Sequence, residues 1–105
     1  MDTANALLIN GEWQAADSGK TLGVLNPATE ETIAEIPYGG REGKKRGLEA
    51  AVSVLALWRE RNAWGRAEIL KKTASLLRER VDEIGKILTT EQGKPLAEAK
   101  GEVMH

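Results

Sequence analysis

The chain has 105 residues, 41% of them hydrophobic, so it can bury one modest core and is expected to form a single compact unit or part of one. Its 15 basic and 16 acidic residues give a formal net charge of -1, without the excess positive charge that favours nucleic acid or anionic membrane surfaces. The absence of cysteine excludes disulfides, thiolate metal sites and a cysteine nucleophile in this chain.

Residues 1–38 are predicted to form strands and turns, because turn residues interrupt each short apolar run before a helical period can build. The first run, Leu7 to Ile9, leads into Asn10-Gly11, and Glu12-Trp13 follows. An Asn-Gly pair tolerates the positive φ angles of a tight turn. The sequence therefore predicts a hairpin at the amino-terminal end.

A second pair of strands is expected over residues 21–25 and 32–36. The segment Asn26-Pro27-Ala28-Thr29 between them has the composition of a turn, with Pro27 fixing its own φ. Pro37 and the pair Gly39-Gly40 then interrupt the chain, so the change from strands to helices is placed there.

Residues 41–103 are predicted to be helical, beginning with a helix over residues 42–58. Its apolar stripe consists of Leu48, Ala51, Val52 and Leu55. Gly43 and Gly47 each cost about 1 kcal/mol relative to alanine in a helix, so its first turns, around Lys44-Lys45-Arg46, are expected to fray. These three basic side chains are interpreted as a solvated face.

Three further helices are expected. The second covers residues 65–80, with a stripe that consists of Ile69, Leu70, Thr73, Leu76 and Leu77. Asp82 is predicted to cap the third, whose stripe consists of Ile84, Ile87 and Leu88. Gly93 and Pro95 form a stop signal, with Lys94 facing the negative end of the third helix. A last helix starts near Leu96 and is still running at His105.

Nothing in the sequence resembles a catalytic or metal-binding set, so no catalytic, cofactor-binding or metal residue is assigned. His105 is the single histidine and has no partner for a zinc site. Glu30-Glu31 is interpreted as surface charge in a turn. The tryptophans are interpreted as packing anchors; they are Trp13, Trp58 and Trp64.

No export or membrane signal is found. Met1 to Asn5 carry no positive charge on a side chain, and the apolar stretch Ala6 to Ile9 is too short for a signal peptide. The longest weakly polar run, residues 50–58, is far below the ~20 residues that a membrane span needs. We expect a cytoplasmic protein with neither nucleic acid nor membrane as a partner.

Three blocks of the chain, in this order, resemble the start of the aldehyde dehydrogenase family. Leu8 to Trp13 resembles its opening hairpin, and Asn26-Pro27-Ala28-Thr29 resembles its second turn. Residues 91–102, which begin Glu91-Gln92-Gly93-Lys94-Pro95, resemble the succinate-semialdehyde and glutarate-semialdehyde branch. Residues 63–70, with Leu76 and Leu77, are also similar to the family. Together the resemblance covers residues 8–103.

This resemblance implies an enzyme that oxidises an aldehyde to a carboxylate and passes hydride to NAD or NADP, after a cysteine thiolate attacks the carbonyl carbon. A glutamate general base, an oxyanion-holding asparagine and the pyrophosphate site are also implied, and all lie outside the matched part. The fold implied is α/β, with residues 1–105 a partial amino-terminal segment of the NAD(P)-binding domain, forming its outer part. This chain alone is therefore expected to be inactive.

The resemblance also suggests a monovalent-cation site made by backbone carbonyls near Val24 and Leu25 with Glu91, where cation-binding members have aspartate. Glu30 stands where many members have glycine. Met104-His105 ends the chain where the family's helix continues, which predicts premature termination by a frameshift, a gene fragment or an artificial cut.

Two hypotheses remain open. In the first, the chain is an inert fragment whose helices lack the sheet they should cover, so weak cooperativity or self-association is expected. In the second, it is a stand-alone interaction module that docks onto a full-length aldehyde dehydrogenase. Catalysis by the chain itself is disfavoured by its composition, since it has no cysteine.

Overall fold

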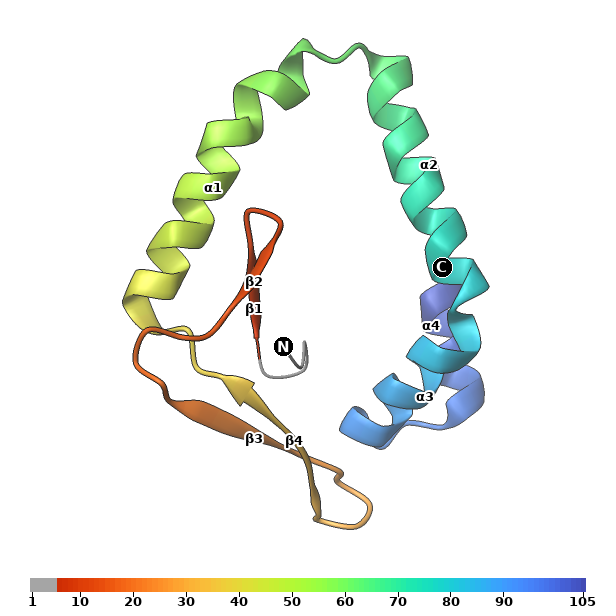
Figure 1. The fold of residues 1–105 in the computed structure, drawn as a ribbon. Coiled ribbons are helices and arrows are strands. Elements are labelled where there is room, and N and C mark those ends of the chain that lie inside the picture. The colour runs from red at the N-terminus through yellow and green to blue at the C-terminus, as the bar shows by residue number, and fades with distance from the viewer. Residues whose placement is uncertain (1–5) are drawn as a thin grey trace. The chain divides into compact units, whose positions relative to one another are not determined.

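The computed structural model describes residues 6–105, which form four strands followed by four helices (Figure 1). The elements are β1 (Leu7–Ile9), β2 (Glu12–Gln14), β3 (Thr21–Leu25), β4 (Thr32–Pro37), α1 (Gly40–Glu60), α2 (Ala63–Glu79), α3 (Val81–Gln92) and α4 (Leu96–Met104). The mixed α/β class and the order of strands before helices are confirmed. Met1 to Asn5, on which the expectation of no signal peptide partly depends, lie outside the described residues.

The two predicted hairpins are both present. β1 pairs antiparallel with β2, with Leu8 opposite Trp13. Asn10 and Gly11 have φ angles of 52° and 76°, as the Asn-Gly turn requires. β3 pairs with β4, and the backbone N–H of Asn26 donates to the carbonyl of Glu31 at 2.9 Å to close the turn between them.

The chain divides into two compact units, which differs from one of the two expected outcomes, a single compact unit; that it is part of a larger unit stays a prediction. The first unit contains β1, β2, β4, α1 and β3 as far as Val24. The second contains the turn Leu25–Glu31 together with Arg61–His105, which holds α2, α3 and α4.

In the first unit, the hairpin packs against the start of α1 through glycine. Gly43 is buried, and a Cβ at this position would lie 3.5 Å from Cδ1 of Leu7 in β1. α1 is helical from Gly40 onward, two residues before the predicted start, and the fraying around Gly43 and Gly47 stays a prediction. The missing side chain at Gly43, unfavourable for an isolated helix, lets β1 approach the helix closely.

In the second unit, α2 begins two residues earlier than predicted because Asn62 caps it, its Oδ1 accepting from the N–H of Gly65 at 2.8 Å. The predicted cap by Asp82 is wrong: Arg80 precedes α3 and makes no side-chain cap bond, while Asp82 lies inside the first turn. There its negative charge still favours the positive end of the helix.

The end of α3 follows the prediction. Gly93 has a φ of 75° and its N–H donates to the carbonyl of Thr89 at 2.8 Å, which is a left-handed helix cap. Pro95 then precedes α4, which ends at Met104. α3 and α4 pack together at two small residues, Gly85 and Ala99, and Ala99 is 0% exposed.

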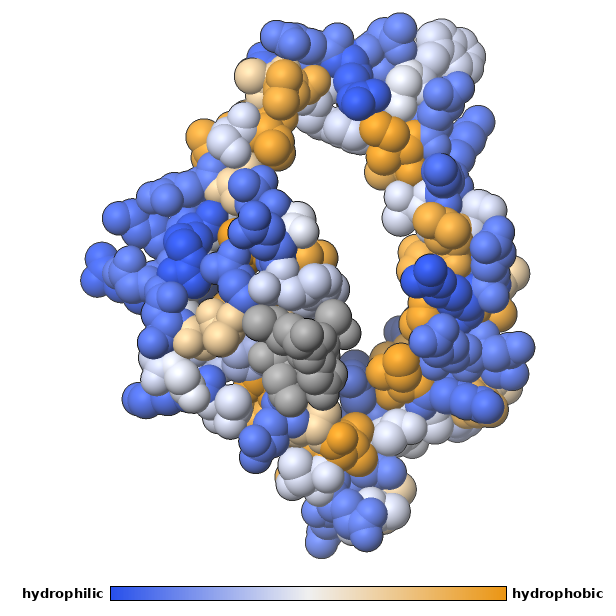
Figure 2. Space-filling model, in the orientation of Figure 1, coloured by the Kyte–Doolittle hydropathy of each residue, from blue (hydrophilic) through white to orange (hydrophobic). Residues whose placement is uncertain are grey.

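The described residues have few buried apolar side chains. Only Ala16 and Ala99 are both apolar and buried among them, and no large side chain is fully buried. The accessible surface is 8295 Å². Two separate compact bodies that share the 11.4 kDa equally would together expose about 7,000 Å². The chain thus exposes more surface than two compact bodies of this mass, and large apolar side chains are among the exposed groups (Figure 2).

None of the helices found in residues 6–105 has the length and apolar character that a membrane span requires.

Candidate functional site

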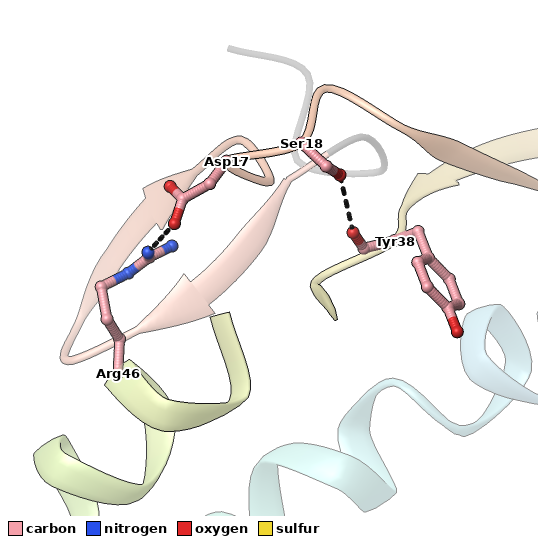
Figure 3. Close-up of polar contacts among 4 residues, drawn as sticks. All are labelled: Asp17, Ser18, Tyr38 and Arg46. Atoms are coloured by element: carbon pink, nitrogen blue, oxygen red, sulfur yellow. Dashed lines mark hydrogen bonds and ion pairs between the residues drawn. The ribbon is translucent and has the colours of Figure 1, made fainter. Parts of the chain in front are cut away.

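The most developed polar cluster in the first unit fixes the loop before β3 to α1 and to the end of β4. A guanidinium N–H of Arg46 donates to the carboxylate of Asp17, and the hydroxyl of Ser18 donates to the carbonyl of Tyr38 at 3.4 Å (Figure 3). The N–H of Tyr38 donates in turn to the carbonyl of Lys20 at 2.8 Å. These contacts hold a loop and contain no nucleophile paired with a base.

The basic segment at the start of α1 is only partly the solvated face that was predicted. Lys44 and Lys45 are exposed, whereas Arg46 is partly buried and forms the ion pair with Asp17. A hollow of about 570 Å³ lies beside this segment; its lining residues are Tyr38, Gly40, Arg41, Lys44, Lys45 and Leu48. No carboxylate, imidazole or thiol lines it, and its charged side chains are those of Arg41, Lys44 and Lys45.

In the second unit, one ion pair joins the loop after α3 to α4, and another joins α4 to α3. Nζ of Lys94 lies 2.6 Å from a carboxylate oxygen of Glu102, so Lys94 contacts α4, which differs from its predicted role at the end of α3. Nζ of Lys100 lies 3.0 Å from a carboxylate oxygen of Asp82. The hydrogen bond from Lys100 and its positive charge hold the pKa of the Asp82 carboxyl below its usual value. Both pairs are partly exposed, and neither resembles a catalytic dyad.

Sequence reasoning missed a contact between two of the blocks that carry the family resemblance. Pro27 lies against Gly93, so that a Cβ on Gly93 would be 2.9 Å from Cγ of Pro27. Both residues belong to the second unit. The turn between β3 and β4 is therefore seated on the end of α3, 66 positions further along the chain. No local pattern signals such a contact.

The second unit contains all of the singled-out carboxylates and the histidine, and they form no metal cluster among its described residues. Glu91 is exposed at the end of α3 and His105 follows α4. Glu30 and Glu31 are exposed in their turn. Within residues 6–105, no cluster of three or more histidine, aspartate or glutamate side chains is arranged to hold a metal ion. Val24 belongs to the first unit whereas Leu25 and Glu91 belong to the second, so the monovalent-cation site stays a prediction.

The tryptophans differ from their interpretation as packing anchors. Trp64 is 80% exposed at the start of α2, and Trp13 is also exposed in β2, so for these two the interpretation is wrong. Trp58 is half-buried near the end of α1. The sequence pattern indicates that a tryptophan is suited to packing, but it does not show whether this chain supplies the surface that covers it.

Comparison with known proteins identifies relatives across nearly the whole chain. The model of the family described as "Aldehyde dehydrogenase family" matches residues 13–105. Glutarate-semialdehyde dehydrogenase of Pseudomonas putida is 46% identical over 97 residues, which is 92% of this chain and 20% of the relative. The NADP⁺ succinate-semialdehyde dehydrogenase of Escherichia coli is 41% identical over 98 residues, 93% of this chain and 20% of the relative.

Solved structures agree. Succinate-semialdehyde dehydrogenase from Burkholderia pseudomallei superposes with a TM-score of 0.90 at 47% identity, covering 94% of this chain and 20% of its own. The chain thus spans about one fifth of the length of the relatives that it matches.

Proposed function

Because the chain belongs to the aldehyde dehydrogenase family, we propose that it is the amino-terminal part of an NAD(P)-dependent semialdehyde dehydrogenase and serves there as scaffold of the dinucleotide-binding domain. The observation that carries this proposal is the 46% identity to glutarate-semialdehyde dehydrogenase across 92% of the chain. Similarity to the succinate-semialdehyde enzymes supports the same substrate class, an aldehyde that carries a carboxylate.

The chemistry is assigned to the rest of such an enzyme. Aldehyde oxidation in this family is implied to need a cysteine thiolate, and this chain has no cysteine. Gly39, Gly40 and Gly43 lack the spacing of a pyrophosphate-binding loop, so we assign no NAD(P)-binding residue to this chain. We therefore assign no catalytic step to these 105 residues.

A chimera tests the proposal. The segment of the Pseudomonas putida enzyme that aligns with this chain is replaced by the 105 residues, and NADH and NADPH formation is measured with glutarate and succinate semialdehydes. A scaffold of the same kind should keep kcat/KM within about tenfold of the parent, since the catalytic residues are unchanged. A soluble chimera that shows no semialdehyde-dependent reduction beside an active parent contradicts the proposal.

The second candidate is a stand-alone module that docks onto a full-length relative. The exposed apolar surface of the chain is the observation that favours it. Mixing the chain with the intact Pseudomonas putida enzyme and separating by size distinguishes the two. If the chain is scaffold, it should elute apart from the intact enzyme, because the enzyme's own amino-terminal segment already occupies the corresponding position. A docking module should co-elute with the enzyme.

The proposal includes a cytoplasmic location, which imaging of the tagged chain tests.

A further inference from the structure

The turn of the β1–β2 hairpin places a side-chain amide directly before a glycine. Asn10 and Gly11 have φ angles of 52° and 76°, and the strands on either side of them pair with Ile9 opposite Glu12. A Cβ on Gly11 would meet nothing within 4 Å. The backbone nitrogen of Gly11 and the carboxamide of Asn10 therefore have room to rotate toward each other.

Asn26, in the turn between β3 and β4, lacks this arrangement. Its Oδ1 accepts from the backbone N–H of Ala28 at 2.9 Å, which holds the carboxamide in place. The residue that follows is Pro27, whose backbone nitrogen carries no proton and is not a nucleophile. Asn26 is therefore protected twice, by a hydrogen bond and by the next residue.

Asn62, the cap of α2, is held as well. Its Oδ1 accepts from the backbone N–H of Gly65 at 2.8 Å, and the next residue, Ala63, is the first of the helix. Within residues 6–105, by contrast, no hydrogen bond holds the side chain of Asn10. Of the three asparagines in that range, Asn10 is the one whose carboxamide is free to meet the next backbone nitrogen.

We propose that Asn10 is a self-modification site, at which the backbone nitrogen of Gly11 attacks the side-chain carbonyl carbon and Asn10 becomes aspartate or isoaspartate. The new bond joins the Gly11 nitrogen to Cγ of Asn10, and the bond between Cγ and Nδ2 breaks. Nδ2 leaves as ammonia, taking the proton that the Gly11 nitrogen gives up, and a succinimide ring remains. Water then opens the ring at either of its carbonyl carbons. No oxidant or reductant takes part.

The hairpin is small enough to open and allow this attack. Each of its strands has three residues, and a two-stranded hairpin of this size is only marginally stable on its own. Its hold on α1 includes the contact of Leu7 with Gly43, where a Cβ would lie 3.5 Å from Cδ1 of Leu7. Opening such an element costs less free energy than unfolding the whole chain, so the turn samples reactive conformations.

The two products have different effects on the hairpin. Aspartate keeps the turn, because Asp-Gly favours the same backbone conformation as Asn-Gly. Isoaspartate sends the main chain through Cγ and so lengthens it by a methylene carbon. A tight turn of that length no longer fits the register that sets Ile9 opposite Glu12, so β1 separates from β2.

Either product also adds a carboxylate beside an apolar wall. Asn10 and Gly11 border a groove of about 330 Å³ within the first unit, opposite small and apolar residues of α1. These residues are Gly47, Ala50, Ala51 and Val54. A negative charge at this place is less favourable than the neutral amide that it replaces.

The test follows the asparagines of the folded 105-residue chain during incubation at mildly alkaline pH. Peptide mapping by mass spectrometry measures conversion of amide to acid at each asparagine. Isoaspartate is measured with protein isoaspartate methyltransferase and radioactive S-adenosylmethionine. Asn62 is the control in the same chain, and Asn10→Gly is the control variant, because Gly-Gly keeps the turn but has no carboxamide. A free peptide of residues 8–13 gives the rate without the fold.

We expect Asn10 to convert at least about tenfold faster than Asn62, because glycine leaves its backbone nitrogen unobstructed. The rate in the folded chain should lie within about tenfold of the rate in the free peptide, since the hairpin opens readily. Asn10→Gly should remove most of the methyl labelling. In the purified isoaspartate form, amide exchange of β1 and β2 should speed up by at least about tenfold, while exchange in α3 stays unchanged.

Conversion of Asn10 below the limit set by the free peptide overturns the proposal, as does equal conversion of Asn62. Methyl labelling that Asn10→Gly leaves undiminished, or unchanged exchange of β1 and β2 in the isoaspartate form, also overturns it. None of these measurements uses an aldehyde or a dinucleotide, so their outcome is independent of the proposed function.

Discussion

Pro27 and Gly93 are in contact so close that a Cβ on Gly93 would lie 2.9 Å from Cγ and 3.7 Å from Cβ of Pro27. Gly93 is also left-handed, with a φ of 75°. The same residue thus ends α3 and receives the turn between β3 and β4. Both requirements exclude a side chain, for different physical reasons.

Gly93→Ala should therefore destabilise the second unit. The left-handed conformation costs about 1–2 kcal/mol for a residue with a Cβ, and the contact with the proline ring adds about 1–3 kcal/mol of overpacking. Urea unfolding followed by circular dichroism measures the change. Gly101→Ala is the control, because a Cβ there meets nothing within 4 Å inside α4 and alanine should stabilise the helix by about 0.5–1 kcal/mol. Equal behaviour of the two variants contradicts the close contact.

Gly85→Val should loosen the packing of α3 on α4. A Cβ at position 85 would lie 2.9 Å from Cγ and 3.5 Å from the backbone nitrogen of Lys100. The side chain of Lys100 can move but its backbone cannot, so a branched residue should cost about 1–3 kcal/mol. Amide exchange at Ala99, which is fully buried in the native packing, should accelerate. Unchanged protection of that amide is the result that refutes this packing.

Acid should weaken the link between the start of α3 and α4. Lys100 lowers the pKa of the Asp82 carboxyl in the folded chain, so folding favours the ionised carboxyl. The resulting stabilisation is present above the unfolded pKa and is lost as pH falls through the lower folded value, that is, below about pH 4. Comparing the acid titration of wild type with that of Asp82→Asn, by circular dichroism, checks the sign. On acidification the wild type should lose more folding stability than the variant. Adding 0.5 M salt should reduce this difference in stability loss, because the ion pair is exposed.

Glu30→Gly should stabilise the turn between β3 and β4. Glu30 has a φ of 62°, a conformation that costs a residue with a Cβ about 1 kcal/mol and glycine almost nothing. The melting temperature should rise by a few degrees. Glu31→Gly is the matched control, because Glu31 is the next residue and is not among the positive-φ positions, so glycine there should only add unfolded-state entropy. A lower melting temperature for Glu30→Gly contradicts the turn geometry.

Local chemistry explains why most of the elements were predictable. The Asn10-Gly11 turn and the Gly93 cap depend on residues adjacent in the chain, and both were predicted and found. Asn62 was missed as the cap of α2, although an asparagine three positions before Gly65 carries that signal. Asp82 was wrongly assigned as a cap because its charge is favourable anywhere in the first turn, so the residue type alone does not fix the position.

Contacts between distant positions were not predictable. Asp17 and Arg46 are 29 positions apart, and nothing near either residue distinguishes this pair from other opposite charges. Gly43 is a second residue whose long-range contact the local sequence does not predict. Its low helix propensity is visible in the sequence, but the close approach of Leu7 to its backbone is not. Likewise, the apolar period of α1 identifies one face of the helix, but it does not show whether that face is covered, and Leu48 is exposed.

The central claim is that these 105 residues are scaffold and that the sulfur chemistry belongs to polypeptide outside them. The most direct test is to incubate the purified chain, free of any other dehydrogenase, with succinate or glutarate semialdehyde and NAD⁺ or NADP⁺, and to follow absorbance at the reduced nicotinamide band. We predict no formation of NADH or NADPH above the rate without protein. Sustained, protein-proportional reduction that requires the semialdehyde would contradict the account.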